Sequence, residues 1–399
     1  CGMTRPGGRW APDGRASTIH AQARASASAL GRPPDVLLLH APDPRVALAT
    51  SVRALVRARE EGLARAIGLC NVSRSELEEA ARAASGSAPP FAVVQVALGA
   101  GDDTAARGGV ISWCKANGAI VLAHSPLGGP KRAPRLEREP ALRAVARRHG
   151  VSAAQVMLAY LLAVDDVIVP IPGATRPETA LAAAAAGRLV LDEEELRTLD
   201  ARFPGLAMTR RPPRAPAAAE AAADVVLVMG LAGSGKSRLA ERYVVEGYER
   251  LNRDTLGGTL SGIARRLEGV LGRGARRVVL DNTYLTRASR SEVVRVAHSS
   301  GAAVRCVHVD VPIEEAQVNV TGRMLERHGE LLGAGELAAR AKGDPNLFAP
   351  GTLYRMERSL ERPAAEEGFA SIEVVPFARD HEDGCAGVAI PLELVIGSS

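Results

Sequence analysis

The 399-residue sequence contains few aromatic residues, few cysteines and very little lysine. Aromatic residues account for 3% of the chain, which leaves few side chains that could stack on the bases of a nucleic acid. The cysteines are scattered without paired spacing, a pattern that fits reduced thiols better than a disulfide framework or a zinc site. They are Cys1, Cys70, Cys114, Cys306 and Cys385.

Long apolar runs are lacking as well. We find no stretch of about 18 uncharged apolar residues and no charged and then apolar leader, so we expect a cytoplasmic protein without membrane contact. With 46% hydrophobic residues, the chain is long enough for about two domains with full cores. Its net charge of +5 comes almost wholly from arginine, so basicity alone is weak evidence for a nucleic-acid partner. The oligomeric state is not indicated.

One of the four lysines lies in a strand–turn–helix pattern. The apolar run 225–229 precedes the spacing Gly-x-x-x-x-Gly-Lys-Ser, and a helical pattern follows it. Glycines at this spacing let successive backbone N–H groups converge on phosphate oxygens, while the lysine reaches the β- and γ-phosphates and the serine binds Mg²⁺. The pattern therefore predicts binding of ATP and Mg²⁺. The predicted nucleotide-binding residues are Gly230, Gly233, Ser234, Gly235, Lys236 and Ser237.

The first half of the chain alternates strands and helices. Its apolar runs are too continuous to face water, which indicates a parallel sheet covered by helices. The predicted strands are 35–40, 66–70, 92–96, 119–123 and 167–171. Predicted helix-capping boxes begin at Ser73, Ser152 and Thr175, and at Ser289 in the second half. A closed barrel of this kind needs eight units, so residues 1–205 are predicted to form an α/β fold, an incomplete (β/α)₈ TIM barrel.

Several segments of this half resemble the aldo-keto reductases. They are 35–43, 66–71, 93–95, 123–127, 171–178 and 191–196. The resemblance implies a barrel that binds NADP(H) and reduces a carbonyl through a tetrad of Asp, Tyr, Lys and His. Only His40 matches that tetrad, and the segment 1–5 is similar to the one that follows the family's lysine. We therefore expect no carbonyl reduction from this chain, with NADP-dependent oxidoreductase activity of a full-length barrel as the alternative.

The cofactor positions of this half match the family only in part. The resemblance implies that Asn71 and Gln95 bind the nicotinamide amide and that Arg176 holds the 2′-phosphate of NADP(H). Cys70 and His124 stand where the family has a serine and an aromatic residue. His40 itself also has a simpler interpretation, as a histidine at a strand end with a structural hydrogen bond.

Residues 206–224 are rich in proline, arginine and alanine, as is typical of an exposed linker. The second half, 225–399, then alternates strands and helices again, which predicts a P-loop NTPase domain with a doubly wound α/β fold. Asp281 ends an apolar strand and would lie beside Mg²⁺ and Ser237, or else cap the following turn. Arg323 and Arg327 project from one helix face, and either remain solvated or bind phosphates. The stretch 329–352 could form a lid.

The second half resembles the kinase domain of polynucleotide kinases. The matching segments are 230–237, 251–257, 278–283, 288–290, 315–319, Arg323, 354–355, 361–363 and 367–369. The resemblance implies transfer of the γ-phosphoryl group of ATP to a 5′-hydroxyl, with Asp254 as the general base and Arg323 at the transferring phosphoryl. The implied partners are ATP and single-stranded or nicked 5′ ends of nucleic acid. A small-molecule kinase, an ATPase and a nucleotide-gated binding module are the alternatives.

Overall fold

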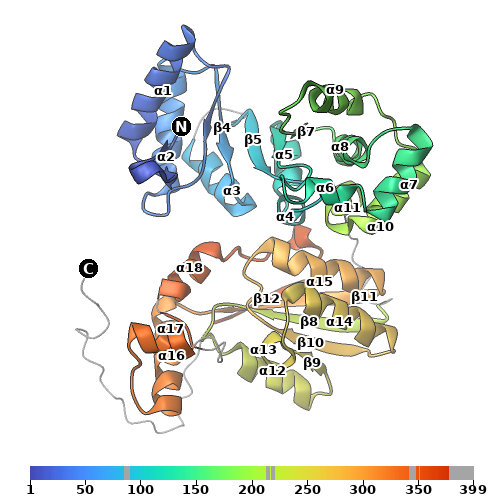
Figure 1. The fold of residues 1–399 in the computed structure, drawn as a ribbon. Helices are drawn as coiled ribbons and strands as arrows, with labels where there is room; N and C mark the ends of the chain where they lie inside the picture. The colour runs from blue at the N-terminus through green and yellow to red at the C-terminus, as the bar shows by residue number, and fades with distance from the viewer. Residues whose placement is uncertain (85–89, 213–215, 217–220, 341–346, 350, 377–399) are drawn as a thin grey trace.

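The computed structural model describes residues 1–84, 90–212, 216, 221–340, 347–349 and 351–376. Figure 1 shows two bodies, an N-terminal half from residue 1 to 212 and a C-terminal half from residue 221 onward. The N-terminal half opens with a short antiparallel pair, β1 (Met3–Thr4) and β2 (Ala11–Pro12), joined through the 3₁₀ helix η1 (Pro6–Gly8).

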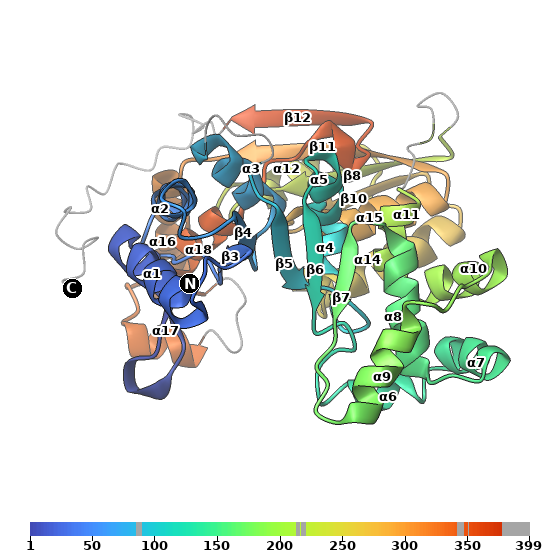
Figure 2. The same cartoon turned by 90° about the horizontal axis from the view of Figure 1, so that it is seen from above.

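Five parallel strands form the sheet of the N-terminal half, in the order β3-β4-β5-β6-β7. They are β3 (Val36–Leu39), β4 (Ala66–Cys70), β5 (Val93–Ala97), β6 (Ile120–His124) and β7 (Ile168–Ile171). Figure 2 shows these strands side by side in sequence order. The five predicted strands and the incomplete parallel barrel are therefore confirmed, with β3 and β7 as the two edges of the described sheet.

Eleven described helices accompany this sheet. They are α1 (Ala16–Leu30), α2 (Leu48–Glu60), α3 (Arg74–Ala83), α4 (Thr104–Arg107), α5 (Val110–Ala116), α6 (Ala133–Leu136), α7 (Pro140–His149), α8 (Ala153–Val164), α9 (Pro177–Ala186), α10 (Glu193–Arg202) and α11 (Pro204–Arg210). The predicted capping boxes at Ser73 and Ser152 are present. The one at Thr175 is wrong, because Arg176 is the N-cap and Pro177 presets the first helical turn.

The first residues of the predicted linker, 206–210, are part of a helix. Residues 204–210 form α11, which packs on α4 and α8 and buries Leu206 to 1% exposure. Pro204 starts this helix because its fixed φ suits the first helical turn, and Phe203 and Leu206 supply apolar surface. The high proline and arginine content of the segment concealed this helix. The exact domain boundaries remain a prediction.

The C-terminal half contains a second parallel sheet, in the order β12-β11-β8-β10-β9. Its strands are β8 (Ala223–Met229), β9 (Glu249–Leu251), β10 (Arg277–Asp281), β11 (Ala302–Asp310) and β12 (Ser371–Pro376). Its helices are α12 (Lys236–Val245), α13 (Arg253–Leu256), α14 (Leu260–Gly272), α15 (Arg287–Ser299), α16 (Ile313–His328), α17 (Ala334–Arg340), α18 (Gly351–Ser359) and the 3₁₀ helix η3 (Ala365–Glu367).

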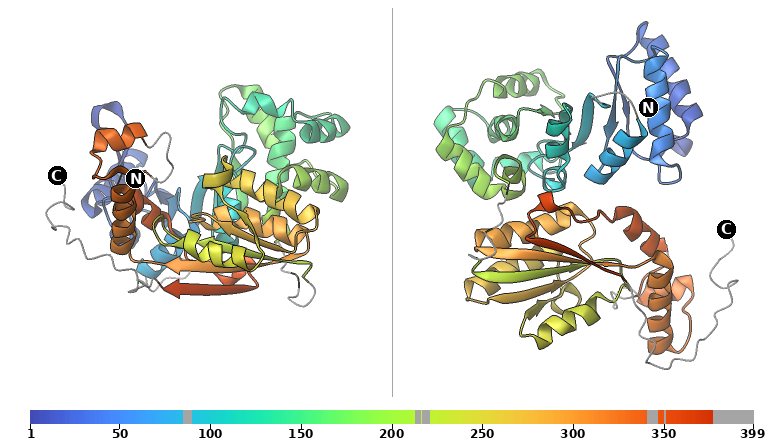
Figure 3. Two further views of the ribbon diagram at one scale, coloured as in Figure 1. Left: turned by 90° about the horizontal axis from the view of Figure 1, so that it is seen from below. Right: turned by 180° about the vertical axis from the view of Figure 1, so that it is seen from behind.

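Helices cover both faces of this second sheet (Figure 3). Successive residues of β8 alternate between two cores, since side chains of a strand point to opposite faces. Val225 and Leu227 pack in the core with α14 and α15, whereas Val226 and Val228 pack in the core with α12 and α16. The predicted doubly wound fold is confirmed. Helix α15 is capped by Thr286, three residues before the predicted Ser289.

The two halves touch through α3 and α4 on one side and α15 and η3 on the other. The Arg107 guanidinium donates to the backbone oxygen of Ala288, and Arg74 forms an ion pair with Glu366 at 2.8 Å. Ser75 Oγ lies 3.4 Å from a carboxylate oxygen of Glu361. These contacts join the N-terminal half to α15 and to the segment around η3, and none of the three involves a residue of the glycine-rich loop 230–237.

Arg290 of α15 is the largest fully buried side chain among the residues that the structure describes, with 0% exposure. Its guanidinium donates to both carboxylate oxygens of Glu367 at 2.7 and 2.8 Å, and to the backbone oxygens of Tyr284 and Leu285. We predict that Arg290→Met lowers the free energy of unfolding by about 3–5 kcal/mol, because it leaves the Glu367 carboxylate buried without its main partner. Urea unfolding measures the change.

The control for this prediction is Arg295→Met on the same helix. No ion pair of Arg295 is present among the described residues, so its replacement should alter the free energy of unfolding by less than about 0.5 kcal/mol. Equal effects of the two substitutions would contradict a stabilising role of the Arg290–Glu367 pair.

Candidate functional site

The glycine-rich loop joins β8 to α12, and its backbone requires glycine at three positions. Gly230, Gly233 and Gly235 have φ values of +146°, +82° and +88°. A Cβ atom on Gly230 would lie 2.6 Å from the backbone oxygen of Val309, and one on Gly233 would lie 2.6 Å from that of Ala316. A Cβ atom on Gly235 would meet nothing within 4 Å. The loop is therefore held tightly at two glycines and bare at the third, as a phosphate cradle needs.

Lys236 is the first residue of α12, and its side chain folds back over this loop. It is 8% exposed, and its Nζ donates to the backbone oxygen of Leu231 at 2.5 Å. Burial lowers the pKa of Lys236 to about 8, an effect that Arg323 adds to and that Asp281 and Asp254 oppose. Burial thus destabilises the charged ammonium group, and the anionic oxygens of a bound phosphate would stabilise it.

We predict that ATP affinity falls as the pH rises above about 8. The negative phosphates of ATP raise the pKa of Lys236 in the complex. Above about pH 8 the free lysine is neutral, so ATP binding takes up a proton. The affinity for ATP therefore drops by up to about tenfold per pH unit in that range. Below about pH 7 the lysine is charged in both states and this dependence disappears. Titration calorimetry measures the trend, and Lys236→Arg, which stays charged, should show none of it.

Asp281 lies beside the loop because of the strand order. The order reverses around β8, which lies between β10 and β11, and ligands of such sheets bind at the carboxyl ends of the strands at this point. Asp281 is the last residue of β10, pairs in register with Val228, and is 1% exposed. Its Oδ2 accepts hydrogen bonds from Arg250 and from Asn252 Nδ2. These two donors fix the orientation of the carboxylate.

Asp254 lies at the same edge of the sheet, on the short helix α13. Asn252 caps this helix by accepting from the backbone N–H groups of Asp254 and Thr255 at 2.8 and 3.1 Å. Asn282 accepts from the backbone N–H of Arg253 at 2.9 Å, which ties α13 to the end of β10. The Asp254 side chain is 41% exposed and lies 3.5 Å from the Arg253 guanidinium, so its carboxylate is accessible to an incoming ligand.

Arg323 approaches the loop from the opposite side, on α16. Asn319 Nδ2 on this helix donates to the backbone oxygen of Gly233 at 2.8 Å and so fastens α16 to the loop. Arg323 lines the pocket and forms no hydrogen bond or ion pair with the residues that the structure describes. Arg327, predicted to share its helix face, does not line this pocket. Of the two arginines, Arg323 is therefore the one that faces the loop.

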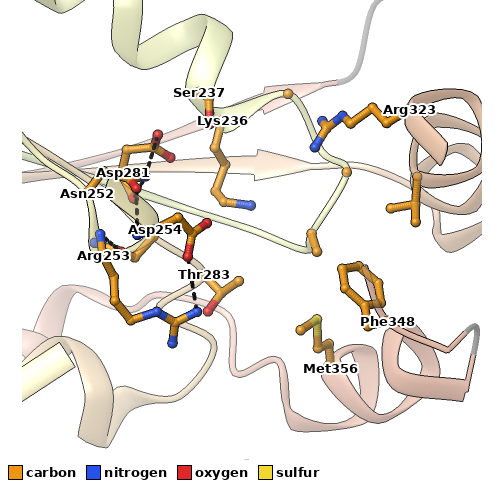
Figure 4. Close-up of a pocket in the computed structure, with 15 residues that line it drawn as sticks. Lys236, Ser237, Asn252, Arg253, Asp254, Asp281, Thr283, Arg323, Phe348 and Met356 are labelled. Carbon is orange, nitrogen blue, oxygen red and sulfur yellow. Dashed lines mark hydrogen bonds and ion pairs between the residues drawn. The ribbon is translucent and has the colours of Figure 1, made fainter. Parts of the chain in front are cut away.

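These side chains line one pocket that encloses about 710 Å³, open solvent included. Figure 4 shows Lys236 between the side that carries Asp254 and Asp281 and the side that carries Arg323. Val320, Phe348 and Met356 form an apolar wall that the sequence analysis missed. Part of the predicted lid, 341–346 and residue 350, lies outside the described residues.

The oxygen donors of this pocket suit Mg²⁺. Ser237 offers a hydroxyl and Asp281 a carboxylate, and hard cations prefer such ligands. No group of three or more His, Cys, Asp or Glu residues that could hold a metal ion occurs in the described part of the chain. A magnesium ion here would therefore complete its shell with phosphate oxygens and water, as it usually does in nucleotide sites.

All candidate residues of the N-terminal half except Arg176 lie in or just after the strands β3 to β6. Asn71 Nδ2 donates to the backbone oxygen of His40 at 2.9 Å, and Asn71 Oδ1 lies 3.1 Å from His124 Nε2. The backbone N–H of Asn71 donates to the oxygen of Gln95 at 2.8 Å. Arg176 is exposed just before α9. No hydrogen bond between the described residues joins its side chain to His40, Asn71 or Gln95. The His40 ring lies over Trp10 with centroids 6.4 Å apart.

Comparison with known proteins divides the chain in the same way. Residues 5–202 match the model of the aldo/keto reductase family, and residues 225–339 match that of an AAA domain. The chain therefore carries an aldo/keto reductase domain followed by an AAA domain. No helix in the described part of either domain is long and apolar enough to cross a membrane.

Curated relatives of the two domains are different proteins. The AAA domain is similar to the bifunctional polynucleotide phosphatase/kinase of Schizosaccharomyces pombe, 31% identical over 164 residues, which are 40% of this chain and 36% of that protein. The reductase domain is similar to aldo-keto reductase family 1 member A1 of Rattus norvegicus, 33% identical over 155 residues, which are 37% of this chain and 45% of that protein. The chain thus spans less than half of either relative.

Solved aldo-keto reductases also match the reductase domain. A thermostable aldo-keto reductase in complex with the inhibitor epalrestat is 30% identical, with a TM-score of 0.43, and the match covers 47% of this chain and 66% of that one. An aldo-keto reductase of Klebsiella pneumoniae in complex with NADPH is 26% identical, with a TM-score of 0.42, over 47% of this chain and 64% of that one.

Proposed function

We propose that the AAA domain transfers the γ-phosphoryl group of ATP to the 5′-hydroxyl of a nucleic acid. The observation that supports this most is that Asp254 and Arg323 line the same pocket as the glycine-rich loop but come from opposite sides of it. Similarity to a polynucleotide phosphatase/kinase over this domain supports the acceptor class. The apolar wall of Val320, Phe348 and Met356 suits the base of the nucleotide.

In the proposed reaction Asp254 accepts the proton of the acceptor hydroxyl as its oxygen bonds to the γ-phosphorus. The bond between the γ-phosphorus and the bridging oxygen of ADP breaks, and ADP leaves with that electron pair. Lys236 and the loop N–H groups hold the β- and γ-phosphates, and Arg323 binds the oxygens of the phosphoryl group in transit. Bound Mg²⁺ would be held by Ser237 and Asp281 and would neutralise charge on the phosphates.

The test is a comparison of acceptors with the full chain, ATP and Mg²⁺. We expect phosphoryl transfer to oligonucleotides that carry a 5′-hydroxyl and none to the same oligonucleotides blocked by a 5′-phosphate. Equal transfer to glycerol or to a free nucleoside would instead favour the small-molecule kinase. ATP hydrolysis that no acceptor changes would favour an ATPase.

For the reductase domain we propose that this chain binds NADP(H) weakly and reduces no carbonyl. The one tyrosine of the reductase domain, Tyr160, has 0% exposure and donates to Asp200 at 2.8 Å, so it cannot serve as a proton donor at His40. Burial and the Asp200 carboxylate both raise the pKa of Tyr160. Asn71 is already engaged with His40 and His124.

We predict that the 399-residue chain oxidises no NADPH in the presence of aldehydes, as measured by the loss of NADPH absorbance. A catalytic acid is worth about 10²–10⁴ in rate, so its lack should leave turnover at background. Measurable turnover that His40→Ala abolishes would contradict this prediction.

A further inference from the structure

A second groove lies next to the candidate base, outside the nucleotide pocket. It encloses about 840 Å³, open solvent included, and shares no lining residue with the nucleotide pocket. Its lining residues are Gly257, Gly258, Thr259, Gly262, Arg265 and Arg266. Gly257 directly follows α13, the four-residue helix that carries Asp254. The groove therefore begins where the helix of the candidate base ends.

Two arginines without carboxylate partners supply the charge of this groove. Arg265 and Arg266 are exposed on α14, and neither forms an ion pair or hydrogen bond with the residues that the structure describes. The opposite face of α14 is buried, with Ile263 and Leu267 at 0% exposure. Core packing thus fixes the helix so that both guanidinium groups face solvent beside the groove.

The remaining lining is almost free of side chains. A Cβ atom on Gly257 or Gly258 would meet nothing within 4 Å, and one on Gly262 would meet only Thr259 Oγ1 at 3.5 Å. Among the described residues that line the groove there is no aromatic ring. A ligand here can approach the backbone closely and bind through charge, but it cannot stack bases on the protein. This combination suits a phosphodiester backbone and gives no readout of base sequence.

We propose that this groove binds the phosphodiester groups that follow the 5′-terminal nucleotide of the acceptor strand, through Arg265 and Arg266. The proposal rests on the proposed function, because it takes Asp254 as the position of the 5′-hydroxyl. Gly257 follows the helix of Asp254 directly, and Arg265 and Arg266 lie five and six residues into α14, which begins three residues later. Because phosphates of a stacked strand are about 3.4 Å apart along its axis, a dinucleotide offers a single phosphodiester group, whereas a longer acceptor offers several to the two arginines.

The experiment compares Arg265→Gln/Arg266→Gln with the wild-type full chain. Two 5′-hydroxyl DNA acceptors are used, a dinucleotide and a dodecanucleotide, and binding of a 3′-fluorescein dodecanucleotide is measured by anisotropy as a function of salt. The matched control is Arg143→Gln/Arg147→Gln, which removes two exposed charges from α7 of the reductase domain. Both double variants change the net charge equally.

We expect the Arg265/Arg266 variant to raise the KM for the dodecanucleotide by about tenfold, with the dinucleotide KM and both kcat values nearly unchanged. The slope of log affinity against log salt should fall by about 1.4, which is two phosphate contacts on a single strand. Equal losses for both acceptors, or no difference from the control, would overturn the proposal. If wild type phosphorylates neither acceptor, the proposed function fails, while the salt slope of binding still decides whether the groove holds the strand.

Discussion

Arg323→Ala should lower the rate of phosphoryl transfer by about 10³–10⁵, the range seen for arginines that bind a phosphoryl group in transit. Arg323 lines the nucleotide pocket, and Asn319 holds its helix against Gly233, so the guanidinium is placed by a fixed element. The Arg323 guanidinium forms no hydrogen bond or ion pair within the described residues, so no such contact has to break when it binds phosphate. Single-turnover kinetics with saturating ATP isolates the chemical step from ATP binding.

The control for Arg323 is Arg327→Ala, one helical turn further along α16 and outside the pocket lining. Its rate should stay within about threefold of wild type, because it removes the same charge at a greater distance from the loop. Arg323→Lys keeps the charge but loses the planar donor pair, so it should recover only part of the rate. Equal rates for Arg323→Ala and Arg327→Ala would rule out contact with the phosphoryl group.

Asp254→Asn should lower the transfer rate by about 10²–10⁴, because an amide cannot accept the proton of the acceptor hydroxyl. ATP affinity should change little, since Asp254 is on α13 and not on the loop that cradles the phosphates. The helix should persist, because its cap is the Asn252 side chain and the backbone N–H at position 254 remains. Rapid-quench measurement of the first turnover and calorimetry with ATP separate the two effects.

Asp310→Asn is the matched control for this carboxylate. Asp310 also ends a strand of the same sheet, β11, but does not line the nucleotide pocket. Its replacement should leave the transfer rate within about twofold of wild type. A variant Asp254→Asn that kept the wild-type rate would show that another group, or water, accepts the proton.

Local sequence patterns predicted the architecture well because the fold depends on buried apolar strands. The continuous apolar runs in both halves are the strands of two parallel sheets, and the glycine spacing at residues 230–237 marks a loop in which a Cβ atom would clash. Helix α11 was not predicted, because the proline and arginine content of residues 206–224 is typical of a linker. Its burial depends on α4 and α8, which lie far away in the sequence.

The supporting contacts of the nucleotide pocket could not be predicted from spacing. Three amide side chains form hydrogen bonds with backbone groups of elements that are far away in the sequence. They are Asn252, Asn282 and Asn319, and only the fold shows which backbone group each one reaches. The same is true of the Arg250 contact that orients Asp281. Single amide side chains carry no periodic signal, so geometry is needed to assign them a role.

The most direct measurement is the position of the label after the full chain has been incubated with ATP labelled at the γ-phosphate, Mg²⁺ and a 5′-hydroxyl oligonucleotide. Digestion of the product to 5′-mononucleotides should place the label in the 5′-terminal mononucleotide, and Lys236→Ala should abolish it. Release of labelled inorganic phosphate with no label in the oligonucleotide would contradict the assignment of the AAA domain as a 5′-hydroxyl kinase.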